Sequence, residues 1–544
     1  MKKMKAFDSG SSLGAVLRPR LWRIVLLCVL ALVLAVLQVG MAVIFRYVID
    51  AVISGSDKQI FWAVLLVVDL LGQVGIHALS SWYTSSTADR LTVALRSRLL
   101  ESAVNSPTVR LEQYHSGQLL SRGMEDVRTL CDGIVQAFPA LVGQVARLVA
   151  AFCAVLFIYP ALAGILLIAG LVVLVGVAAL RPVLRKKQSA VRKTDEKVMS
   201  TMQEDLQQLE LIQSLEVQDQ ILARFDKRQR KSLSARFRQR LWSVGANGAV
   251  NTASMIGTGA LLLWGAAKVA AGVLSYGALT SLIQLLGQFR TPVLGLSGLW
   301  NRFISVEVSA ERLSELLEEQ KKPEKHGEEI TPVAVVFENV TFCYNGEETP
   351  VVENFSLRLP LDGWTCLSGF SGRGKSTLFK LILGLYAPQE GRVYLETEKG
   401  QIPCDETTRH LFAYVPQDYA LFSGTVLENL LLVAPNADEA TRRNALERVQ
   451  ADFVFAMSEE ENTTLGENNT GLSKGQIQRL AIARAILMDR PFLLLDECTS
   501  ALDAETENAV LQNLRSLSKG AILVTHRPEA LEQIEGVTAV SMEM

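Results

Sequence analysis

The chain has 544 residues, which corresponds to three or four domains at roughly 150 residues each. Apolar residues make up 49%, charged residues 20%, and the mean hydropathy is +0.24, which excludes a disordered chain and disfavours an ordinary soluble enzyme. The 54 basic and 56 acidic residues leave a net charge of −2, so the positive field typical of nucleic-acid-binding proteins is missing. The seven cysteines contain no CxxC pair, which argues against a disulfide framework or a zinc site. We therefore expect a membrane protein, in contact with lipid and without a nucleic-acid partner.

Long uncharged segments in the first three hundred residues predict membrane-spanning helices. Residues 24–45 carry no charge, and at about 1.5 Å per residue they extend about 33 Å, enough to cross a hydrocarbon layer of about 30 Å. This run is also too long for the core of a signal peptide, so we expect it to remain in the protein. The pair Tyr159-Pro160 divides a later apolar segment, because proline disfavours helical backbone in the residue before it. Six spans are predicted, at about 24–45, 60–83, 134–158, 161–181, 243–267 and 277–300.

The distribution of Arg and Lys predicts how these helices are oriented. Basic residues are concentrated in the amino-terminal segment and in segments 89–130 and 181–240, which the positive-inside rule places in the cytoplasm. The two long segments keep apolar residues at helical spacing, so we expect helices that project beyond the membrane. The predicted organisation is a cytoplasmic segment at 1–20, a transmembrane domain at 21–317, a polar linker at 318–332 and a soluble domain at 333–544.

A phosphate-binding motif is the clearest signal in the soluble domain. Residues 369–376 read GFSGRGKS and match the pattern GxxxxGK[ST], with a predicted strand at 364–368 before them and an apolar-faced helix at 377–385 after them. In such a loop the backbone N–H groups bind phosphate oxygens, Lys375 reaches the β and γ phosphates, and Ser376 supplies a ligand for Mg²⁺. The predicted ATP-binding residues here are Gly369, Phe370, Ser371, Gly372, Arg373, Gly374, Lys375, Ser376 and Thr377.

A second strand is expected to bring carboxylates to the same site. Residues 492–497 read FLLLDE, an apolar run that is typical of a buried parallel strand and ends in two acids. We expect Asp496 to hold Mg²⁺ directly or through water. Glu497 is expected to orient or deprotonate the water that attacks the γ-phosphate.

Between these motifs, residues 472–476 read LSKGQ and resemble the LSGGQ signature of the ATP-binding cassette (ABC) transporters. Four further positions carry the resemblance. Tyr344 corresponds to an adenine-stacking aromatic residue of the family, and Gln417 corresponds to its glutamine loop. Residues 500–503 correspond to the D-loop, and His526 corresponds to the switch histidine. The resemblance extends over essentially the whole chain. It implies an exporter-type half-transporter, with an all-α transmembrane domain of six helices followed by an α/β P-loop ATPase domain.

The resemblance also implies roles for individual residues. Glu497, His526 and Gln417 would be catalytic, and Gln417 would contact Mg²⁺ together with Ser376 and Asp496. Each ATP would be held between the phosphate loop of one subunit and the signature of another, so the protein would be a homodimer or a heterodimer with a second half-transporter. The residues contributed by the partner subunit would be Ser473, Lys474, Gly475, Gln476 and Asp503. Lys474 departs from the glycine of the signature, and a cation there either attracts phosphate or crowds the nucleotide.

Residues 114–122 read YHSGQLLSR and resemble the first cytoplasmic extension of exporter-type family members, whereas the second extension is either a similar docking segment or an amphipathic helix without a partner. In that family a short coupling helix contacts the nucleotide domain, and we place the first at about 111–117 and a second near 204–214. The cargo is harder to predict, because polar residues in spans either line a pathway or join helices. The candidates are Asp69, Arg147, Gln284, Gln288 and Arg290.

These observations predict ATP-driven export of an amphipathic small molecule, drug or peptide by alternating access. A lipid flippase on the same fold would share every catalytic residue. A siderophore-type importer and a regulatory ATPase that does not pump are further alternatives. We expect the protein in a bacterial inner membrane, with the amino terminus and the nucleotide-binding domain in the cytoplasm.

Overall fold

The structure, a computed structural model, describes residues 12–317 except 113 and 115, and residues 331–344, 349–368, 374–417, 421–465, 471–517, 520–525 and 536–541. The chain forms two compact units. The first unit comprises residues 1–103 and 117–319, and the second comprises residues 104–116 and 320–544. The second unit therefore contains a short segment from between two helices of the first.

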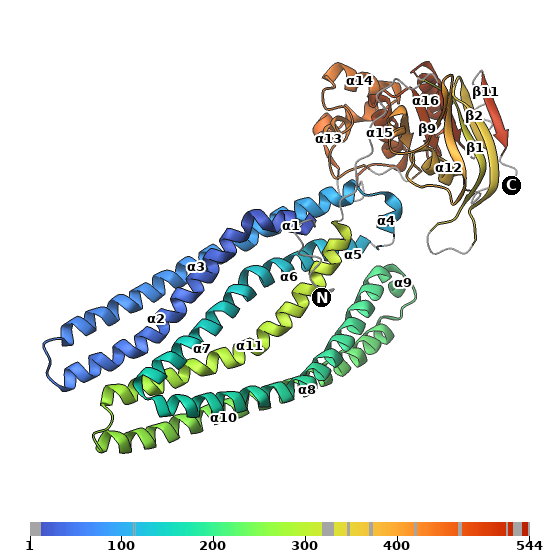
Figure 1. Cartoon of the computed structure of the whole chain (residues 1–544). Coiled ribbons are helices and arrows are strands. Elements are labelled where there is room, and N and C mark those ends of the chain that lie inside the picture. Colours follow the sequence, from blue (N-terminus) through green and yellow to red (C-terminus); the bar gives the residue numbers. More distant parts are fainter. Residues whose placement is uncertain are drawn as a thin grey trace. The chain divides into compact units, whose positions relative to one another are not determined.

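The first unit is helical. Within it α2, α7 and α11 pack together, and α8 packs along α10 (Figure 1). The helices are α1 Ser12–Leu17, α2 Leu21–Ile53, α3 Gln59–Val104, α5 Ser116–Ser121, α6 Val127–Asp132, α7 Phe138–Ile158, α8 Pro160–Gln207, α9 Leu209–Ser214, α10 Gln218–Ala270 and α11 Tyr276–Leu316.

Several of these helices have the length and composition that a membrane requires. Among the described residues four helical stretches qualify: Leu13–Ile53, Gln59–Val104, Leu119–Ile158 and Asn251–Ala270. Tyr159 has extended backbone (φ −152°, ψ 93°), so α7 ends at Ile158 and α8 begins at Pro160, as the proline predicts. The count of six spans itself stays a prediction.

Two π-helical turns, Arg122–Asp126 and Gly133–Ala137, interrupt the helical segment that leads into α7. A Cβ atom on Gly133 would lie 1.8 Å from Cγ2 of Val306 on α11, so only glycine permits this close packing of the two helices. Ser309 of α11 also donates a buried hydrogen bond to Asp126 (2.8 Å). These contacts fix α11 against the irregular turns.

The second unit contains two main sheets. One is antiparallel with the order β2-β1-β4-β5, the other is parallel with the order β11-β3-β10-β9-β6, and β7 pairs with β8. The strands are β1 Pro332–Phe342, β2 Val352–Pro360, β3 Trp364–Ser368, β4 Glu390–Thr397, β5 Gly400–Pro403, β6 Phe412–Val415, β7 Gly424–Thr425, β8 Thr464–Leu465, β9 Phe492–Asp496, β10 Gly520–Val524 and β11 Val537–Ser541. The helices are α4 Thr108–Glu112, α12 Lys375–Ile382, α13 Val426–Leu431, α14 Glu439–Arg448, α15 Lys474–Leu487 and α16 Ala504–Leu517.

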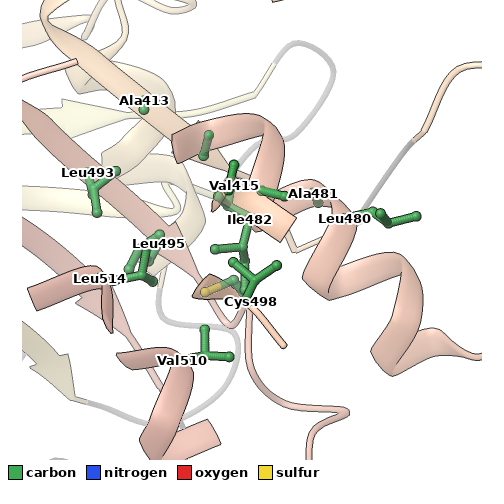
Figure 2. Close-up of a cluster of buried hydrophobic side chains, with 14 of the residues drawn as sticks. Ala413, Val415, Leu480, Ala481, Ile482, Leu493, Leu495, Cys498, Val510 and Leu514 are labelled. Carbon is green, nitrogen blue, oxygen red and sulfur yellow. The ribbon is translucent and has the colours of Figure 1, made fainter. Parts of the chain in front are cut away.

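The parallel sheet is covered on both faces, which explains its continuous apolar strands. Along β9, Leu493 and Leu495 pack in one core cluster with α15 and α16, whereas Leu494 packs in a second cluster with α12 (Figure 2). Every residue of β9 is buried. The strand is therefore rigid, and it ends at the two acids that the sequence singled out.

The short helix nearest the first predicted coupling segment begins earlier than that segment. We expected it at 111–117, but α4 occupies Thr108–Glu112, because Pro107 favours the start of a helix and its carbonyl oxygen accepts from the Arg110 N–H (3.1 Å). Val109 packs against the second unit's apolar core, and a coupling role for α4 stays a prediction. The second predicted coupling segment contains α9 at its carboxyl end.

Candidate functional site

Three strands of the parallel sheet end at one edge, and a predicted motif follows each of them in the sequence. In the strand register Val524 of β10 is paired with Leu367 of β3 on one side and with Asp496 of β9 on the other. Because these strands are parallel, their carboxyl ends lie next to one another at the same edge. The phosphate loop follows β3, Glu497 follows β9, and His526 follows Thr525 at the end of β10. His526 itself lies outside the described residues.

The phosphate loop leads into α12. Gly369, Phe370, Ser371, Gly372 and Arg373 also lie outside the described residues, so the structure places only the end of the motif. Gly374 has φ 77°, and a Cβ atom there would approach the Val351 carbonyl oxygen to 3.2 Å, so this position requires glycine. Lys375 follows at the start of α12 and is only 5% exposed. A buried cation and a helix N-terminus at one point favour an anionic ligand.

Asp496 has the surroundings of a metal ligand. It is 1% exposed, and burial raises the pKa of its carboxyl, although hydrogen bonds with Ser376 and Tyr414 oppose that shift. Its Oδ1 atom is buried and has no hydrogen-bond partner in the described part of the chain. This carboxylate oxygen can still bind a cation, and the Ser376 hydroxyl lies beside the same carboxylate. Mg²⁺ prefers oxygen ligands of this kind. The residues present therefore fit Mg²⁺.

Glu497 lies next to Gln417, although the two are distant in sequence. The Gln417 side chain donates from Nε2 to Oε2 of Glu497 at 3.0 Å. Glu497 adopts a left-handed backbone (φ 50°), unusual for a residue with a side chain, and its N–H donates to the Val524 carbonyl oxygen (3.0 Å). Strained backbone of this kind is often found at functional sites. Two of the three predicted catalytic side chains are thus in direct contact.

Tyr344 is fixed against the first turn of α12. Its hydroxyl oxygen lies 3.0 Å from Oγ1 of Thr377, and Nζ of Lys380 lies 5.3 Å from the ring centre. The Gln389 side chain exchanges two hydrogen bonds with the backbone of Cys343, at 2.7 and 2.9 Å, and so fixes the segment that carries the ring. Lys380 and Gln389 were missed by sequence reasoning, because their partners are set by the tertiary fold. Adenine stacking on Tyr344 stays a prediction.

The signature residues begin α15. Ser473 caps the helix in a reciprocal pair of hydrogen bonds with Gln476, while Lys474 at the first helical position is exposed. A Cβ atom on Gly475 would lie 3.0 Å from the Ala501 carbonyl oxygen, so the signature packs directly on the predicted D-loop. Asp503 ends that loop and accepts from the backbone and side chain of Thr506, both at 2.9 Å, and these bonds lower its pKa.

The cargo candidates of the first unit are only partly described. Asp69 is buried and accepts from Gln73 Nε2 (2.7 Å), and the buried Arg147 Nε has no hydrogen-bond partner among the described residues. Gln284 and Gln288 are half-buried on α11, and the side chain of Arg290 lies outside the described set. A role in cargo binding stays a prediction for all five.

A cavity of about 360 Å³ adds polar residues that the sequence did not point to. It lies in the first unit, beside the second π-helical turn. Its lining residues are Thr129, Asp132, Gly133, Gln136, Arg302, Ser305 and Val306.

Two family models match the chain. The model described as the ABC transporter transmembrane region matches residues 24–293, and the model described as ABC transporter matches residues 352–500. The first match covers predicted spans one to five in full and most of the sixth. The second begins at β2 and ends at Ser500, so it includes the phosphate loop, the signature and Glu497.

Relatives and a solved structure extend these matches. The alpha-hemolysin translocation ATP-binding protein HlyB of Escherichia coli O157:H7 is 28% identical over 497 residues, which cover 89% of this chain and 69% of that protein. The leukotoxin translocation ATP-binding protein LktB of Mannheimia glucosida is 27% identical over 515 residues, covering 91% and 70%. The structure of a bacterial Atm1-family ABC exporter with ATP bound has a TM-score of 0.79 at 20% identity and covers 97% of this chain and 96% of its own, which shows a shared fold.

Proposed function

We propose that this chain, which belongs to the ABC transporter family as an exporter-type half-transporter with fused transmembrane and ATPase domains, exports an amphipathic small molecule, drug or peptide. ATP hydrolysis, a membrane-spanning helical domain and action as a dimer come with that membership. The cargo and its route are the proposal. The names of the relatives refer to the translocation of protein toxins, which supports a peptide among the cargoes.

The catalytic part of the proposal is carried by the hydrogen bond between Gln417 and Glu497, which follows Asp496 in the chain. We assign Glu497 as the general base: it accepts a proton from water as the water oxygen attacks the γ-phosphorus, and the bond to the bridging oxygen of ADP breaks. Gln417 orients that water. Lys375 and the N-terminus of α12 stabilise negative charge on the phosphates, and His526 donates a hydrogen bond to the γ-phosphate.

Asp496 and Ser376 would hold Mg²⁺, with Gln417 completing the protein ligands. Bound there, the ion neutralises charge on the phosphate oxygens. Asp496 contributes a buried carboxylate whose Oδ1 atom has no hydrogen-bond partner in the described part of the chain. The adjacent Glu497 is then left for proton transfer.

We further propose that the dimer is formed by two copies of this chain. Every motif needed for two complete ATP sites is present in one sequence, with Ser473, Lys474, Gly475, Gln476 and Asp503 contributed across the interface. A heterodimer with a second half-transporter is the alternative. ATP binding would favour the closed dimer and an outward-facing cavity, and hydrolysis would reset it.

α4 is the proposed link between hydrolysis and transport. Val109 packs in the core of the second unit, while the chain on either side of α4 continues directly into α3 and α5 of the first unit. A displacement of the ATPase core would therefore pull on both helices. We place this assembly in a bacterial inner membrane with the amino terminus and the ATPase domain in the cytoplasm, following the basic segments.

Reconstitution in liposomes tests the proposal. Purified protein is assayed for ATPase stimulation and ATP-dependent uptake into inside-out vesicles with a panel of labelled amphipathic peptides and dyes, and with Glu497→Gln protein as the blank. Uptake of a peptide or dye supports the proposal. Translocation of a fluorescent phospholipid without uptake of other compounds favours a flippase, and ATP hydrolysis without movement of any probe favours a regulatory ATPase.

A further inference from the structure

A buried glutamine connects the signature helix to the loop that follows Glu497. Gln478 lies in the second turn of α15 and is 0% exposed. Its Nε2 donates to Oγ of Ser500 (3.2 Å), and its Oε1 accepts from the Ala501 N–H (3.1 Å). Both hydrogen-bonding atoms of the amide thus bind the same short loop, 22 and 23 residues further along the chain.

That loop is joined to Glu497 by its own backbone. The Ser500 N–H donates to the Glu497 carbonyl oxygen (3.2 Å), and the Glu497 N–H is bonded to the end of β10. On the far side, Thr499 donates from Oγ1 to Oε1 of Glu507 (2.6 Å), with both residues buried. Since Glu497 has a left-handed backbone, its carboxylate direction depends on how this loop is held.

We propose that Gln478 is a positioning residue for Glu497 of the same chain. It makes α15 and the Glu497–Ala501 loop move together, so a shift of the signature helix is transmitted to the direction of the catalytic carboxylate. This inference rests on the proposed function, in which the amino end of α15 contacts ATP bound to the partner subunit. Occupancy of the partner's site would then set the geometry of the base in the chain's own site.

Close packing at the amino end of α15 supports a rigid connection between this helix and the Glu497–Ala501 loop. A Cβ atom on Gly475 would lie only 3.0 Å from the Ala501 carbonyl oxygen, and Leu502 lies in the core cluster that also contains α15 residues. The helix cannot slide along the loop without breaking the two hydrogen bonds that the side-chain amide of Gln478 makes. A purely structural glutamine would contribute to the stability of the domain but would have no special relationship with Glu497.

The test compares Gln478→Met with wild type in the full-length transporter. Methionine keeps the length of the side chain and loses both hydrogen bonds. We expect kcat for ATP hydrolysis to fall about 10- to 100-fold, because a displacement of about 1 Å at a reacting group has an effect of that size. KM and the binding of a fluorescent ATP analogue should stay close to wild type. Ser500→Ala, a smaller change at the other end of the bond, should lower kcat in the same direction and less.

Combination with Glu497→Gln separates positioning from a structural role. If Gln478 acts through Glu497, the residual hydrolysis of Glu497→Gln is not lowered further by adding Gln478→Met, and ATP is still trapped. A further tenfold loss in the double variant, or loss of ATP trapping, overturns the inference, as does a wild-type kcat for Gln478→Met. Asn513→Leu serves as control: it removes another partly buried amide, which donates to the carbonyl oxygen of Arg448 at the end of α14, and should keep wild-type kcat.

Failure of the proposed function itself gives a different result. If Glu497→Gln alone hydrolyses ATP at the wild-type rate, the assignment of the base is wrong whatever the Gln478 variants do. If Glu497→Gln is inactive and the Gln478 effects are absent, only the positioning role is wrong. The melting temperature of each variant in detergent confirms that the protein is folded.

Discussion

The hydroxyl oxygens of Tyr344 and Thr377 lie 3.0 Å apart, so the tyrosine ahead of the phosphate loop is hydrogen-bonded to α12, the helix that follows the loop. The ring is also packed edge-on by Phe342 and Tyr386, with centroids 5.0 and 5.4 Å away. Its orientation is therefore fixed before nucleotide binds, and no rotamer entropy is lost when a base stacks on it.

Tyr344→Ala should raise KM for ATP with little change in kcat. Stacking of a base on an aromatic ring contributes about 1–3 kcal/mol, which corresponds to an increase of roughly 5- to 150-fold. Tyr344→Phe keeps the ring and loses the hydroxyl contacts with Thr377 (3.0 Å) and Lys380 (3.4 Å), so its KM should rise less, by up to about tenfold. Steady-state ATPase rates against ATP concentration give both constants. A wild-type KM for Tyr344→Ala would exclude base stacking at this position.

Glu497→Gln should bind ATP and fail to hydrolyse it. Loss of a general base lowers the rate by about 10²- to 10⁴-fold, whereas the phosphate contacts of α12 are unchanged. Gln417→Ala removes the hydrogen bond to this carboxylate and should lower kcat about 10- to 100-fold, as expected for a hydrogen bond to a charged group. Phosphate release and retention of labelled ATP measure the two effects.

An exposed glutamine provides the control for Gln417. Gln401→Ala, on the short strand β5 of the antiparallel sheet, should have wild-type kcat. If Gln401→Ala and Gln417→Ala reduce the rate equally, the contact between Gln417 and Glu497 has no catalytic role.

The reasons why some of these features could be predicted from the sequence are physical. The strand at 364–368 was predicted with the bounds that the structure shows, and β9 at 492–496 occupies all but the last residue of the predicted run 492–497, because a parallel strand covered on both faces is a continuous apolar run. The break at Tyr159-Pro160 was equally clear, since proline acts locally. The helix nearest the first predicted coupling segment begins at Thr108, about three residues before that segment, because the resemblance located a stretch of chain and Pro107 sets where the helix begins.

Contacts between distant segments left no such local pattern. Gln478, Gln389 and Lys380 are polar residues whose partners lie in other elements, and nothing in their own neighbourhood distinguishes them from solvated side chains. The resemblance assigned Gln417 and Glu497 to the same site but did not predict the hydrogen bond between them. The hydrogen bond itself depends on the register of β6 beside β9.

The thiol next to Glu497 should resist alkylation over a wide pH range. Complete burial raises the pKa of Cys498 to about 12, from an ordinary value of about 8.5. At pH 8 its thiolate fraction is then about 10³-fold below that of a free thiol, and the labelling rate should rise about tenfold for each pH unit up to pH 11. Maleimide labelling of the native protein, with Cys498 followed by peptide mass spectrometry, measures this rate.

The same shift predicts that alkaline pH weakens the fold. Between about pH 8.5 and 12 the unfolded thiol loses its proton while the folded thiol keeps it, so stability falls as pH rises, by at most about 1.4 kcal/mol for each pH unit. Cys498→Ala should show a weaker dependence on pH than wild type in the same denaturation assay. A labelling rate that levels off near pH 9 would show that the thiol is not shielded.

Gly277→Ala should destabilise the contact between α2 and α11. Asp50 of α2 accepts from Ser275 Oγ (2.7 Å) and from the Gly277 N–H (2.9 Å), and a Cβ atom at 277 would lie 2.2 Å from the Arg46 carbonyl oxygen. Overpacking of this kind costs about 1–3 kcal/mol, and the melting temperature should fall by about 2–4 °C for each kcal/mol.

A second glycine of α11 is the matched control. Gly287 has no atom within 4 Å of a built Cβ atom, so Gly287→Ala should leave the melting temperature unchanged or raise it slightly, because alanine favours helix. Equal losses for both variants would mean that glycine in α11 is needed for flexibility rather than for the close approach to Asp50.

Lys474→Ala distinguishes the two effects that a lysine in the signature was expected to have. Because Lys474 is exposed and the Ser473–Gln476 cap does not involve its side chain, the substitution leaves the start of α15 intact. A cation about 4 Å from a phosphate contributes about 1 kcal/mol in water, so KM for ATP should rise about fivefold at low ionic strength. In 1 M salt, where screening acts within about 3 Å, the difference from wild type should disappear. A KM below that of wild type at both salt concentrations would mean that the lysine side chain obstructs the nucleotide. In that case Lys474→Gly should hydrolyse ATP faster than Lys474→Ala.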